Sequence, residues 1–238
     1  MPMNTIDFNH FPLMPGQRIL DLGCGEGRHA LTAYTLEDIE SIGVDLSFKD
    51  LTTAVQRFED FAEPDNRSKS LSLSVADGKC LPFPANSFDK VICSEVLEHI
   101  EDHHVVLAEI NRVLKVGGML AISVPRYGPE WICWKLSEDY HTEKGGHIRI
   151  FHAADLRRDV EKVGMIHFRK HWAHALHVPY WWLKCIFWNK PEDPWVVRTY
   201  HRFLVWDLMK KPLITHYLEK LLDPIIGKSV VMYFVKGL

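Results

Sequence analysis

The sequence predicts an α/β fold in which a mostly parallel sheet is covered by helices on both faces. Between residues 17 and 124, short apolar runs alternate with segments whose apolar residues recur at helical spacing. This alternation is typical of strand–helix–strand crossovers, which place helices over both faces of a parallel sheet. The chain has 238 residues, of which 47% are hydrophobic, so it can form one large domain with a substantial core.

Five strands are expected in the first half of the chain, each an apolar run bounded by glycine or polar residues. They are QRILDLG (17–23), SIGVDLS (41–47), LSLSVADG (71–78), DKVICSE (89–95) and GGMLAISVP (117–125). Helices are expected between them over 27–38, after Ser47 and over 102–115. Ser47 and Asp102 precede two of these helices, where a side-chain oxygen can accept a hydrogen bond from a main-chain amide.

The alternation weakens in the second half of the chain. Residues 126–150 are aromatic and charged and contain glycine, which suits a loop or a short cap. A helix is expected over 152–164, with Gly164 as its stop. Strands are expected over 165–172 and 228–237.

The segment between the last two expected strands holds most of the tryptophans. Within 178–226, three pieces each start near a proline and look helical, since proline suits the first turn of a helix. We therefore divide the chain into an α/β domain over 1–172 and 228–238 and a helical insertion or cap over 173–227.

Charge and cysteine content exclude several classes of protein. Lys and Arg total 28 against 31 for Asp and Glu, so no basic excess indicates nucleic acid as a partner. The five cysteines are scattered and form no C-x-x-C pair, which argues against a disulfide framework or zinc knuckle and suits a reducing compartment. No signal peptide is expected, and no run reaches the roughly 18 apolar residues of a spanning helix. We expect a cytoplasmic protein.

The strongest functional signal is the glycine loop in LDLGCGEGRH (20–29), between an expected strand and an expected helix. Gly23, Gly25 and Gly27 allow the backbone to turn sharply and to lie close to a ligand. The G-x-G-x-G spacing differs from the G-x-G-x-x-G of dinucleotide-binding folds, which argues against an NAD-dependent dehydrogenase. Asp21 ends the strand, and its carboxylate would repel a phosphate but attract an ammonium group. A tight turn without a ligand is the alternative.

Two more carboxylates follow the next two expected strands. Asp45 ends the second strand, where an acid can accept hydrogen bonds from both hydroxyls of a ribose. Asp77 ends the third strand, where it can accept from an exocyclic amine such as adenine N6. Either acid alone could be a helix cap or a surface group. Three acids at the carboxyl ends of successive strands, beside the switch point of an open sheet, favour a binding site over chance.

Four segments together carry a resemblance to a known family. LDLGCGEG, VDLS, VADGKCLPFPANSFDKVICSEVLEHI and LKVGGMLAISVP resemble, in order and spacing, the class I S-adenosylmethionine-dependent methyltransferases. They look closest to the group with the methyltransferase type 11 domain, which includes quinone-methylating enzymes. The match covers 18–125, about half of the chain. It implies a Rossmann-like, seven-stranded sheet with an antiparallel last strand, which 165–172 and 228–237 can complete.

The resemblance implies S-adenosylmethionine as the cofactor, with S-adenosylhomocysteine as the product. The cofactor-binding residues that it implies are Asp21, Gly23, Gly25, Gly27, Asp45, Leu46, Asp77, Gly78, Ser94 and Glu95. The Gly23–Gly27 loop would lie under the methionine part, Asp45 on the ribose and Asp77 at the adenine. Ser94 and Glu95 would face the cofactor and the substrate side.

The acceptor side is less defined by the sequence. Methyl transfer is an in-line displacement, so the enzyme mainly aligns the nucleophile, and a general base is needed only where the acceptor loses a proton. His99 and His147 are the leading catalytic candidates, with a structural or solvated role as the alternative for each. The other residues expected on the substrate side are Tyr140, His152, Trp181 and Trp182.

A histidine run in HWAHALH raises the question of a metal site, because residues i and i+3 share a helix face. The run is His171, His174 and His177. It straddles an expected strand end, and no acidic or cysteine partner lies nearby in the sequence. No metal site is therefore expected.

The aromatic insertion over 178–226 has three interpretations. It could be a hydrophobic lid over a substrate pocket, a dimer or domain-packing surface, or a monotopic membrane contact with Lys184, Lys190, Lys210 and Lys211 at the headgroups. All three suit a bulky apolar or aromatic acceptor better than a small polar one.

The sequence therefore predicts an S-adenosylmethionine-dependent methyltransferase that acts on a small lipid-like, quinone-like or natural-product-like acceptor. The accepting atom, carbon, oxygen or nitrogen, is left open. One alternative is methylation of a protein or nucleic acid. Another is a cofactor-binding partner subunit without catalysis, against which the intact Asp21, Asp45 and Asp77 argue.

Overall fold

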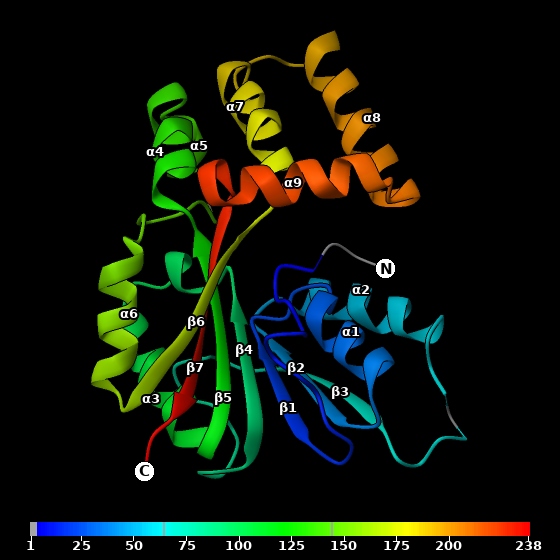
Figure 1. Ribbon diagram of the computed structural model, residues 1–238, viewed down its shortest axis with the longest axis vertical. Helices are drawn as coiled ribbons and strands as arrows, with labels where there is room; N and C mark the ends of the chain where they lie inside the picture. The colour runs from blue at the N-terminus through cyan, green and yellow to red at the C-terminus, as the bar shows by residue number, and fades with distance from the viewer. Residues whose placement is uncertain (1–3, 64, 144) are drawn as a thin grey trace.

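The structure is a computed structural model that describes residues 4–63, 65–143 and 145–238, and its centre is a seven-stranded sheet (Figure 1). The strand order is β3-β2-β1-β4-β5-β7-β6. The strands are β1 (Arg18–Leu22), β2 (Glu40–Asp45), β3 (Ser70–Val75), β4 (Phe88–Ser94), β5 (Leu114–Pro125), β6 (Met165–Ala173) and β7 (Ser229–Lys236). Each overlaps a strand expected from the sequence.

Strand direction divides the sheet into two parts. Strands β1 to β5 pair in parallel, whereas β7 is antiparallel to both β5 and β6, as expected. In the parallel part, Asp21 of β1 pairs with Gly43 of β2 and Ile92 of β4, so these strands end at the same edge. The strand order reverses between the neighbours β1 and β4, because the chain passes from β3 at one edge of the sheet to β4 beside β1. Open α/β sheets bind ligands at this switch point.

Helices cover both faces of the sheet (Figure 1). Helices α1 (Arg28–Leu36) and α2 (Phe48–Glu59) lie on one face, and α3 (His103–Val113) and α6 (Ala153–Lys162) lie on the other. The apolar side chains that α3 and α6 bury in the main core are Val106, Leu107, Ile110, Val113, Leu156 and Val160. Both faces are therefore shielded from water, as the near-continuous apolar strands require.

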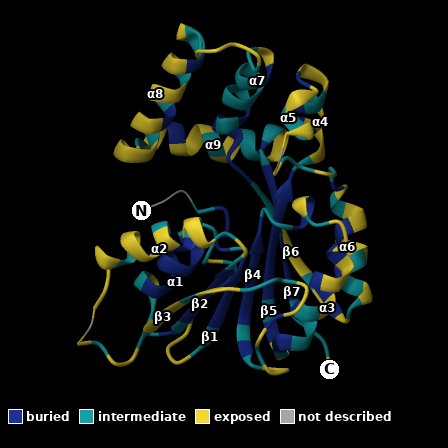
Figure 2. Cartoon of the chain, turned by 180° about the vertical axis from the view of Figure 1, so that it is seen from behind, coloured by how far each residue is buried: buried dark blue, intermediate teal, exposed yellow. Residues whose placement is uncertain are grey.

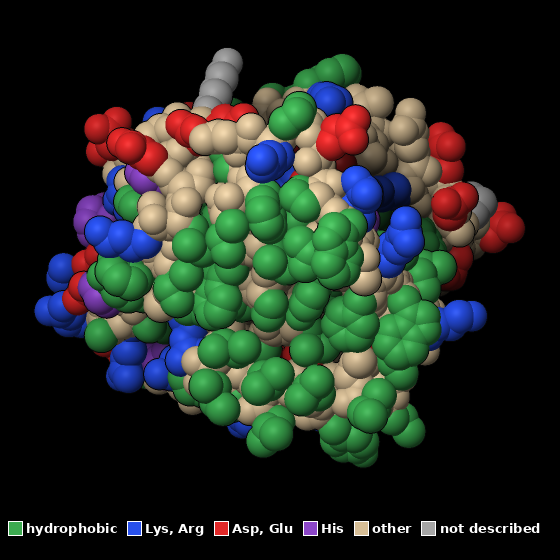
Figure 3. All heavy atoms as spheres, turned by 90° about the horizontal axis from the view of Figure 1, so that it is seen from above, with side chains coloured by type: hydrophobic (Ala, Val, Ile, Leu, Met, Phe, Trp, Pro, Cys, Tyr) green, Lys and Arg blue, Asp and Glu red, His purple; other side chains and the backbone are tan. Residues whose placement is uncertain are grey.

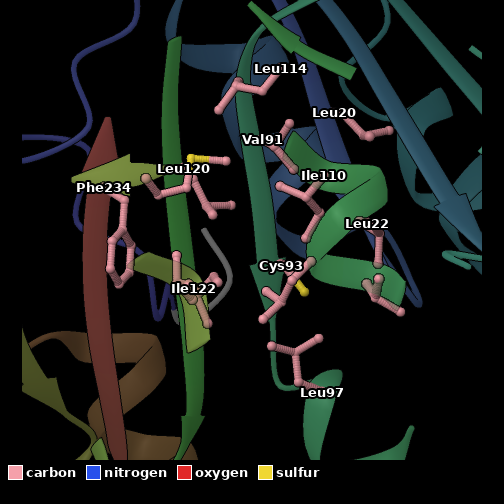
Figure 4. Close-up of a cluster of buried hydrophobic side chains, with 14 of the residues drawn as sticks. Leu20, Leu22, Val91, Cys93, Leu97, Ile110, Leu114, Leu120, Ile122 and Phe234 are labelled. Atoms are coloured by element: carbon pink, nitrogen blue, oxygen red, sulfur yellow. The ribbon is translucent and has the colours of Figure 1, made fainter. Parts of the chain in front are cut away.

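The main core lies between the sheet and α3 (Figure 4). Leu20 of β1, Val91 of β4 and Leu120 of β5 are completely buried there, beside Ile110 of α3. Burying a side chain of this size stabilises the fold by about 1.5–3 kcal/mol. Figure 2 shows the central strands as a buried band, while the edge strands β3 and β6 and the outer helices expose much of their surface. The edge of the sheet that carries the loops is thus held on a rigid support.

Helix ends follow the local sequence in two of three expected cases. The Ser47 hydroxyl accepts a hydrogen bond from the amide of Asp50 at the start of α2, as expected. Gly164 has φ +91° directly after α6, which confirms the expected stop. Asp102 occupies the position before α3, but its side chain accepts no capping hydrogen bond. The expectation that Asp102 caps α3 was therefore wrong.

Residues 126–150 differ from the expected loop or short cap. They contain α4 (Tyr127–Leu136) and the short α5 (Asp139–Thr142). Pro129 lies in the first turn of α4, where proline is tolerated. Its carbonyl accepts a hydrogen bond from the indole of Trp182 on a distant helix. Packing between segments far apart in the sequence stabilises α4, and a local pattern does not report it.

The predicted helical insertion is present between β6 and β7. It consists of α7 (Val178–Ile186), α8 (Trp195–Lys210) and α9 (Leu213–Ile226), which begin at or beside prolines. With α4 and α5, these helices lie beyond the carboxyl ends of the parallel strands (Figure 1). We call these five helices the helical cap. Within the described residues, no helix is both long enough and apolar enough to cross a bilayer.

Candidate active site

A first cavity of about 400 Å³ lies at the carboxyl ends of β1, β2 and β4. Small-molecule sites usually enclose about 300–1,000 Å³, so its size suits a nucleoside-like ligand. Six of the ten residues expected to bind cofactor line this cavity: Gly23, Asp45, Leu46, Asp77, Gly78 and Glu95.

The turn after β1 reaches this cavity at Gly23. Gly23, Gly25 and Gly27 have φ values of 70°, 51° and 81°, which only glycine adopts without strain. A Cβ atom on Gly23 would lie 2.3 Å from a methyl group of Val96, whereas one on Gly25 would meet open space. The turn therefore needs glycine for its backbone shape, and at Gly23 also for space.

Asp45 connects this turn to the end of β2. Its Oδ2 accepts a hydrogen bond from the amide of Gly25 and its Oδ1 accepts one from the amide of Ser47, both at 2.8 Å. Each carboxylate oxygen has a second lone pair, so both can still accept a bond from a ligand. The half-buried side chain lines the cavity, where a ribose diol would offer two donors.

Asp77 lies at the other end of the first cavity, after β3. Its Oδ1 accepts from the amide of Lys79 at 2.9 Å, and its Oδ2 has no partner among the described residues. A Cβ atom on the adjacent Gly78 would lie 3.1 Å from Leu22. The open Oδ2 can accept from an exocyclic amine. The geometry of the turn, Asp45 and Asp77 is thus compatible with the parts of S-adenosylmethionine that the family resemblance implies for them.

The four other expected cofactor residues support the cavity without lining it: Asp21, Gly25, Gly27 and Ser94. Asp21 is 2% exposed, and its Oδ2 accepts from the amide of Ala30 in the first turn of α1. Burial raises the pKa of the Asp21 carboxyl to about 7. Asp21 therefore fixes the start of α1, and its direct contact with a cofactor stays a prediction.

Glu95 lies at the meeting point of the first cavity and a second one of about 380 Å³ under the helical cap. Its backbone has φ 57°, which is uncommon for a residue other than glycine. The Ser123 hydroxyl donates to Glu95 Oε1 at 2.8 Å, which holds the side chain in place. The side chain of Glu95 can therefore face a ligand in either cavity.

The second cavity combines apolar walls with positive charge. Tyr180, Trp181 and Leu204 from α7 and α8 supply aromatic and aliphatic surface. Arg28 and Lys228 also line it, and neither forms an ion pair within the part of the chain that the structure describes. Two such cations suit a ligand with an acidic or electron-rich group on an apolar frame.

His99 and His147, the expected catalytic pair, lie together although they are far apart in the sequence. Their ring centroids are 5.0 Å apart. His147 Nδ1 is 2.6 Å from Oε1 of the buried Glu130, and the Tyr140 hydroxyl donates to Glu130 Oε2 at 3.3 Å. Burial is the largest influence on Glu130 and opposes its ionisation, but the hydrogen bond and charge of His147, the charge of Lys228 and the hydrogen bond from Trp134 together lower the pKa of this carboxyl.

The four expected substrate-side residues separate into two pairs. Tyr140 and Trp181 line a third cavity of about 220 Å³ with His147, and Trp181 also lines the second cavity. The Trp182 indole donates to the carbonyl of Pro129, and the exposed His152 stacks on Tyr127. Trp182 and His152 line none of these three cavities, and their contact with an acceptor stays a prediction.

The histidine run is not isolated from acids once the chain folds. Glu219 of α9 lies beside His174 and His177, with ligand atoms of all three within 4.8 Å of one another. His171 lies apart from this group and stacks on Tyr233. The sequence could not indicate Glu219, because it belongs to a different helix.

Several residues of the site carry no sequence signal that identifies them. Glu98 and Glu130 are buried acids, and Arg28 and Lys228 are cations in the second cavity. For Glu98, the only indication of a role in the site was its position beside His99 in the loop after β4. The others meet the site through tertiary packing of α1, α4 and β7.

The strand order separates this fold from dinucleotide-binding α/β folds. An antiparallel seventh strand lies between β5 and β6, and this arrangement defines the class I methyltransferase fold. Residues 20–122 match the family model described as a methyltransferase domain. The match covers less than half of the chain, and for this stretch it indicates a methyltransferase domain with S-adenosylmethionine as the methyl donor.

Known proteins similar to this chain agree with that assignment. The 27-O-demethylrifamycin SV methyltransferase of Amycolatopsis mediterranei is 37% identical over 47% of this chain and 39% of its own. The sterol 24-C-methyltransferase of Pneumocystis carinii is 27% identical over 66% of this chain and 38% of its own. The chain thus spans less than half of the length of these relatives.

The fold similarity extends further along the chain than the sequence similarity. The crystal structure of the YcgJ protein from Bacillus subtilis aligns with a TM-score of 0.64 and 17% identity. The alignment covers 97% of this chain and 96% of that one. At this identity, the likeness concerns the fold alone.

Proposed function

We propose that this protein transfers the methyl group of S-adenosylmethionine to a small hydrophobic acceptor in the second cavity. The observation that carries the proposal is the position of Glu95, which lines both the first and the second cavity. A donor in one cavity and an acceptor in the other would meet at this side chain. Bound S-adenosylmethionine supplies an electrophilic methyl group on a sulfonium. The protein's part is then to align the accepting atom and to exclude water.

The lining of the second cavity supports an apolar acceptor with one acidic or electron-rich group. Tyr180, Trp181 and Leu204 can pack against an apolar frame, while Arg28 and Lys228 can hold an oxygen that carries negative charge. Two relatives are named for methylation of a rifamycin and of a sterol, which are hydrophobic acceptors, and this agrees with the choice of an apolar acceptor.

We propose that the acceptor extends past Trp181, which lines both the second and the third cavity, and that His147 in the third cavity takes its proton when the accepting atom carries one. Burial and the neighbouring His147 both lower the pKa of His99, so His99 is neutral at neutral pH. Glu130 orients His147 through Nδ1, which leaves Nε2 of His147 to accept a proton. S-adenosylmethionine, held by the Gly23 turn, Asp45 and Asp77, would supply the methyl group to the acceptor's lone pair and would leave as the uncharged thioether. The proton passes to Nε2.

The division of the chain also stays a proposal. A methyltransferase domain over 1–172 and 228–238 would supply the cofactor site, and the insertion over 173–227 would act as a lid. Trp181 supports the lid interpretation, because it lines two cavities from α7. Cytoplasmic location stays a prediction.

We further propose that α8 and α9 contact an anionic membrane surface, from which the acceptor would enter. Trp195, Met209, Leu213, Ile214 and Tyr217 are each at least 65% exposed. Figure 3 shows the broad hydrophobic patch on the face that the cap presents from above.

Charge complementarity favours a membrane over a second copy of the chain as the occupant of this patch. The exposed charged side chains of 195–226 are all basic: Arg198, Arg202, Lys210, Lys211 and Lys220. The three acids of this stretch are Asp207, Glu219 and Asp223, and all are half-buried. Two copies would bring like charges together, whereas anionic headgroups would pair with them.

Labelled S-adenosylmethionine tests the methyl-transfer proposal. The protein is incubated with the labelled cofactor and a cell extract, which is then separated into lipids, other small molecules and macromolecules. Label in the lipid or apolar small-molecule fraction is the expected result. Label in protein or nucleic acid would favour the alternative acceptor class, and no label in any fraction would favour a partner subunit without catalysis.

Sedimentation with vesicles tests the membrane proposal. Wild-type protein should sediment with anionic phosphatidylserine vesicles and less with neutral ones, since the basic residues act through the surface potential. Met209→Glu with Ile214→Glu should abolish sedimentation, whereas Val55→Glu, at an exposed apolar position of α2, should not. Equal loss with the Val55 variant, or a dimer by light scattering that the double variant disrupts, would contradict the proposal.

A further inference from the structure

The loop after β4 places a buried carboxylate without a partner beside two histidines. Glu98, in the short helix η1 (Leu97–His99), is 0% exposed. Neither of its carboxylate oxygens has a hydrogen-bond partner among the described residues. Ligand atoms of Glu98, His99 and His147 all lie within 4.8 Å of one another. A buried ionised carboxylate is costly unless a charge or a metal compensates it.

Both histidines are oriented through the same ring nitrogen. His147 Nδ1 pairs with Glu130 Oε1 at 2.6 Å, and His99 Nδ1 pairs with the carbonyl oxygen of Gly146 at 3.3 Å. With the proton on Nδ1, each ring donates to an oxygen and keeps the lone pair of Nε2 free. Metal-ligating histidines are held in this way, by a carboxylate or a backbone carbonyl on the second ring nitrogen.

We propose that Glu98, His99 and His147 bind a divalent transition-metal ion. Two imidazoles and one carboxylate are a ligand set that Zn²⁺, Fe²⁺ and Mn²⁺ accept, and they leave further positions open. Three ligands that each lie about 2.1 Å from one tetrahedral ion lie about 3.4 Å apart, so ligand atoms up to 4.8 Å apart must move together by up to about 1.4 Å to complete the site. The exposed His99 leaves the ion open to solvent.

Two other clusters of the described residues serve as internal comparisons. In the first, His103 already pairs with Asp159 and with Arg149, so its polar atoms have partners. In the second, His174 Nε2 is bonded to the Thr5 hydroxyl. Only the cluster of Glu98 combines a partnerless carboxylate with two histidines whose Nε2 atoms are free. This difference selects it as the metal site.

The position of the site connects it to the proposed function. His99 lines the first cavity, and His147 lines the third cavity with Tyr140 and Trp181. An ion between them would lie at the border of the cofactor and acceptor sides. There it could bind an acceptor oxygen and lower its pKa, a role that rests on the proposed function and that would replace proton transfer to Nε2 of His147, because the ion would occupy that nitrogen. The binding of the ion itself does not rest on it.

The experiment measures binding of Zn²⁺ or Mn²⁺ alone to protein that has first been stripped with a chelator. We expect one ion per chain by equilibrium dialysis with elemental analysis. Glu98→Gln and His147→Ala should each lower the affinity at least about 100-fold. Glu130→Gln should lower it about 10- to 100-fold, because it removes only the group that orients His147. His104→Ala and His177→Ala, in the other two clusters, should leave the affinity unchanged.

Thermal unfolding without metal keeps the test valid if a variant is poorly folded. Glu98→Gln keeps the size of the side chain and removes a buried charge, so its midpoint should equal or exceed that of the wild type. Metal should raise the midpoints of the wild type, His104→Ala and His177→Ala, but not that of Glu98→Gln. Retained one-to-one binding in Glu98→Gln, loss of binding in His104→Ala or His177→Ala, or no stoichiometric binding by the wild type would each overturn the proposal. Cofactor binding measured separately distinguishes this failure from failure of the proposed function.

Discussion

Oδ2 of Asp45 accepts a hydrogen bond from the main-chain amide of Gly25 at 2.8 Å, and this bond ties the end of β2 to the turn after β1. The same carboxylate also accepts from the amide of Ser47 at the start of α2. One side chain therefore sets the relative position of three segments that surround the first cavity, and it keeps lone pairs for a ligand.

Asp45→Ala should weaken cofactor binding at least about tenfold. The variant loses charge-assisted hydrogen bonds to a ribose, each worth about 1.5–3 kcal/mol, and about 1.4 kcal/mol corresponds to one decade in affinity. It also loosens the glycine turn. Isothermal titration with S-adenosylhomocysteine measures the effect, with Asp60→Ala, at the exposed end of α2, as the matched control. Unchanged affinity in folded Asp45→Ala would mean that the carboxylate only fixes the loops.

Thermal stability should rise with S-adenosylmethionine or S-adenosylhomocysteine and not with NAD or NADP. A ligand at about 100 times its Kd stabilises the native state by about 2.7 kcal/mol. For a chain of this size, this corresponds to an increase in Tm of roughly 5–10 °C. The turn after β1 lacks the glycine spacing that receives a pyrophosphate. An equal shift with NAD would refute the assignment of the first cavity.

The contribution of Asp21 to stability should fall between about pH 4 and pH 7. Burial raises the pKa of its carboxyl to about 7, whereas the pKa is about 3.9 in an unfolded chain. Between these values the folded state binds more protons than the unfolded state. The stabilising contribution is thus complete below about pH 4 and is lost as the pH rises to 7.

Asp21→Asn isolates this effect, because an amide cannot ionise but can still accept a hydrogen bond from the amide of Ala30. Relative to the wild type, the Tm of cofactor-free Asp21→Asn should increase between pH 4 and pH 7. At pH 8 it should exceed the Tm of the wild type. Asp60→Asn provides the control for a solvated carboxylate. Parallel pH profiles of wild type and Asp21→Asn would show that the charge of Asp21 is compensated in the folded state.

The parts of the fold that the sequence predicted depend on local chemistry. The central strands are apolar runs with clear ends, the edge strand β3 alternates serine with apolar residues, and the turn at Gly23 needs a residue without a side chain. A strand pattern and a glycine turn can each be recognised within a stretch of about ten consecutive residues. The cavity at Asp45 and Asp77 follows from strand order, since parallel strands end at one edge.

The parts that the sequence did not predict depend on contacts between distant segments. Helix α4 packs on α7 through the hydrogen bond from Trp182 to Pro129. Because this contact joins distant segments, residues 126–150 need no strong helical pattern of their own, and the sequence shows none. Glu130 reaches His147 from the same helix. Such partners become visible only when the cap folds over the sheet, and for this reason the acceptor side was the least predictable part of the site.

Trp181 and Trp182 adjoin in α7, yet they should have separable roles. Trp181 lines the second and third cavities, whereas the Trp182 indole donates to the carbonyl of Pro129 in α4. Trp181→Ala should therefore raise the KM for the labelled acceptor about tenfold or more, because an aromatic face buried against a ligand contributes about 1.5–3 kcal/mol. Its affinity for S-adenosylhomocysteine should stay within a few-fold of the wild type.

Trp182→Phe should do the opposite. It keeps an aromatic ring but removes the hydrogen bond to Pro129, which costs about 1 kcal/mol and lowers the Tm by about 2–4 °C. The KM for the acceptor should not change. Trp195→Ala, in the exposed first turn of α8, controls for the loss of a tryptophan elsewhere in the cap. If cofactor affinity falls together with acceptor affinity in folded Trp181→Ala, then Trp181 supports the cofactor site, and α7 is not a lid over the acceptor.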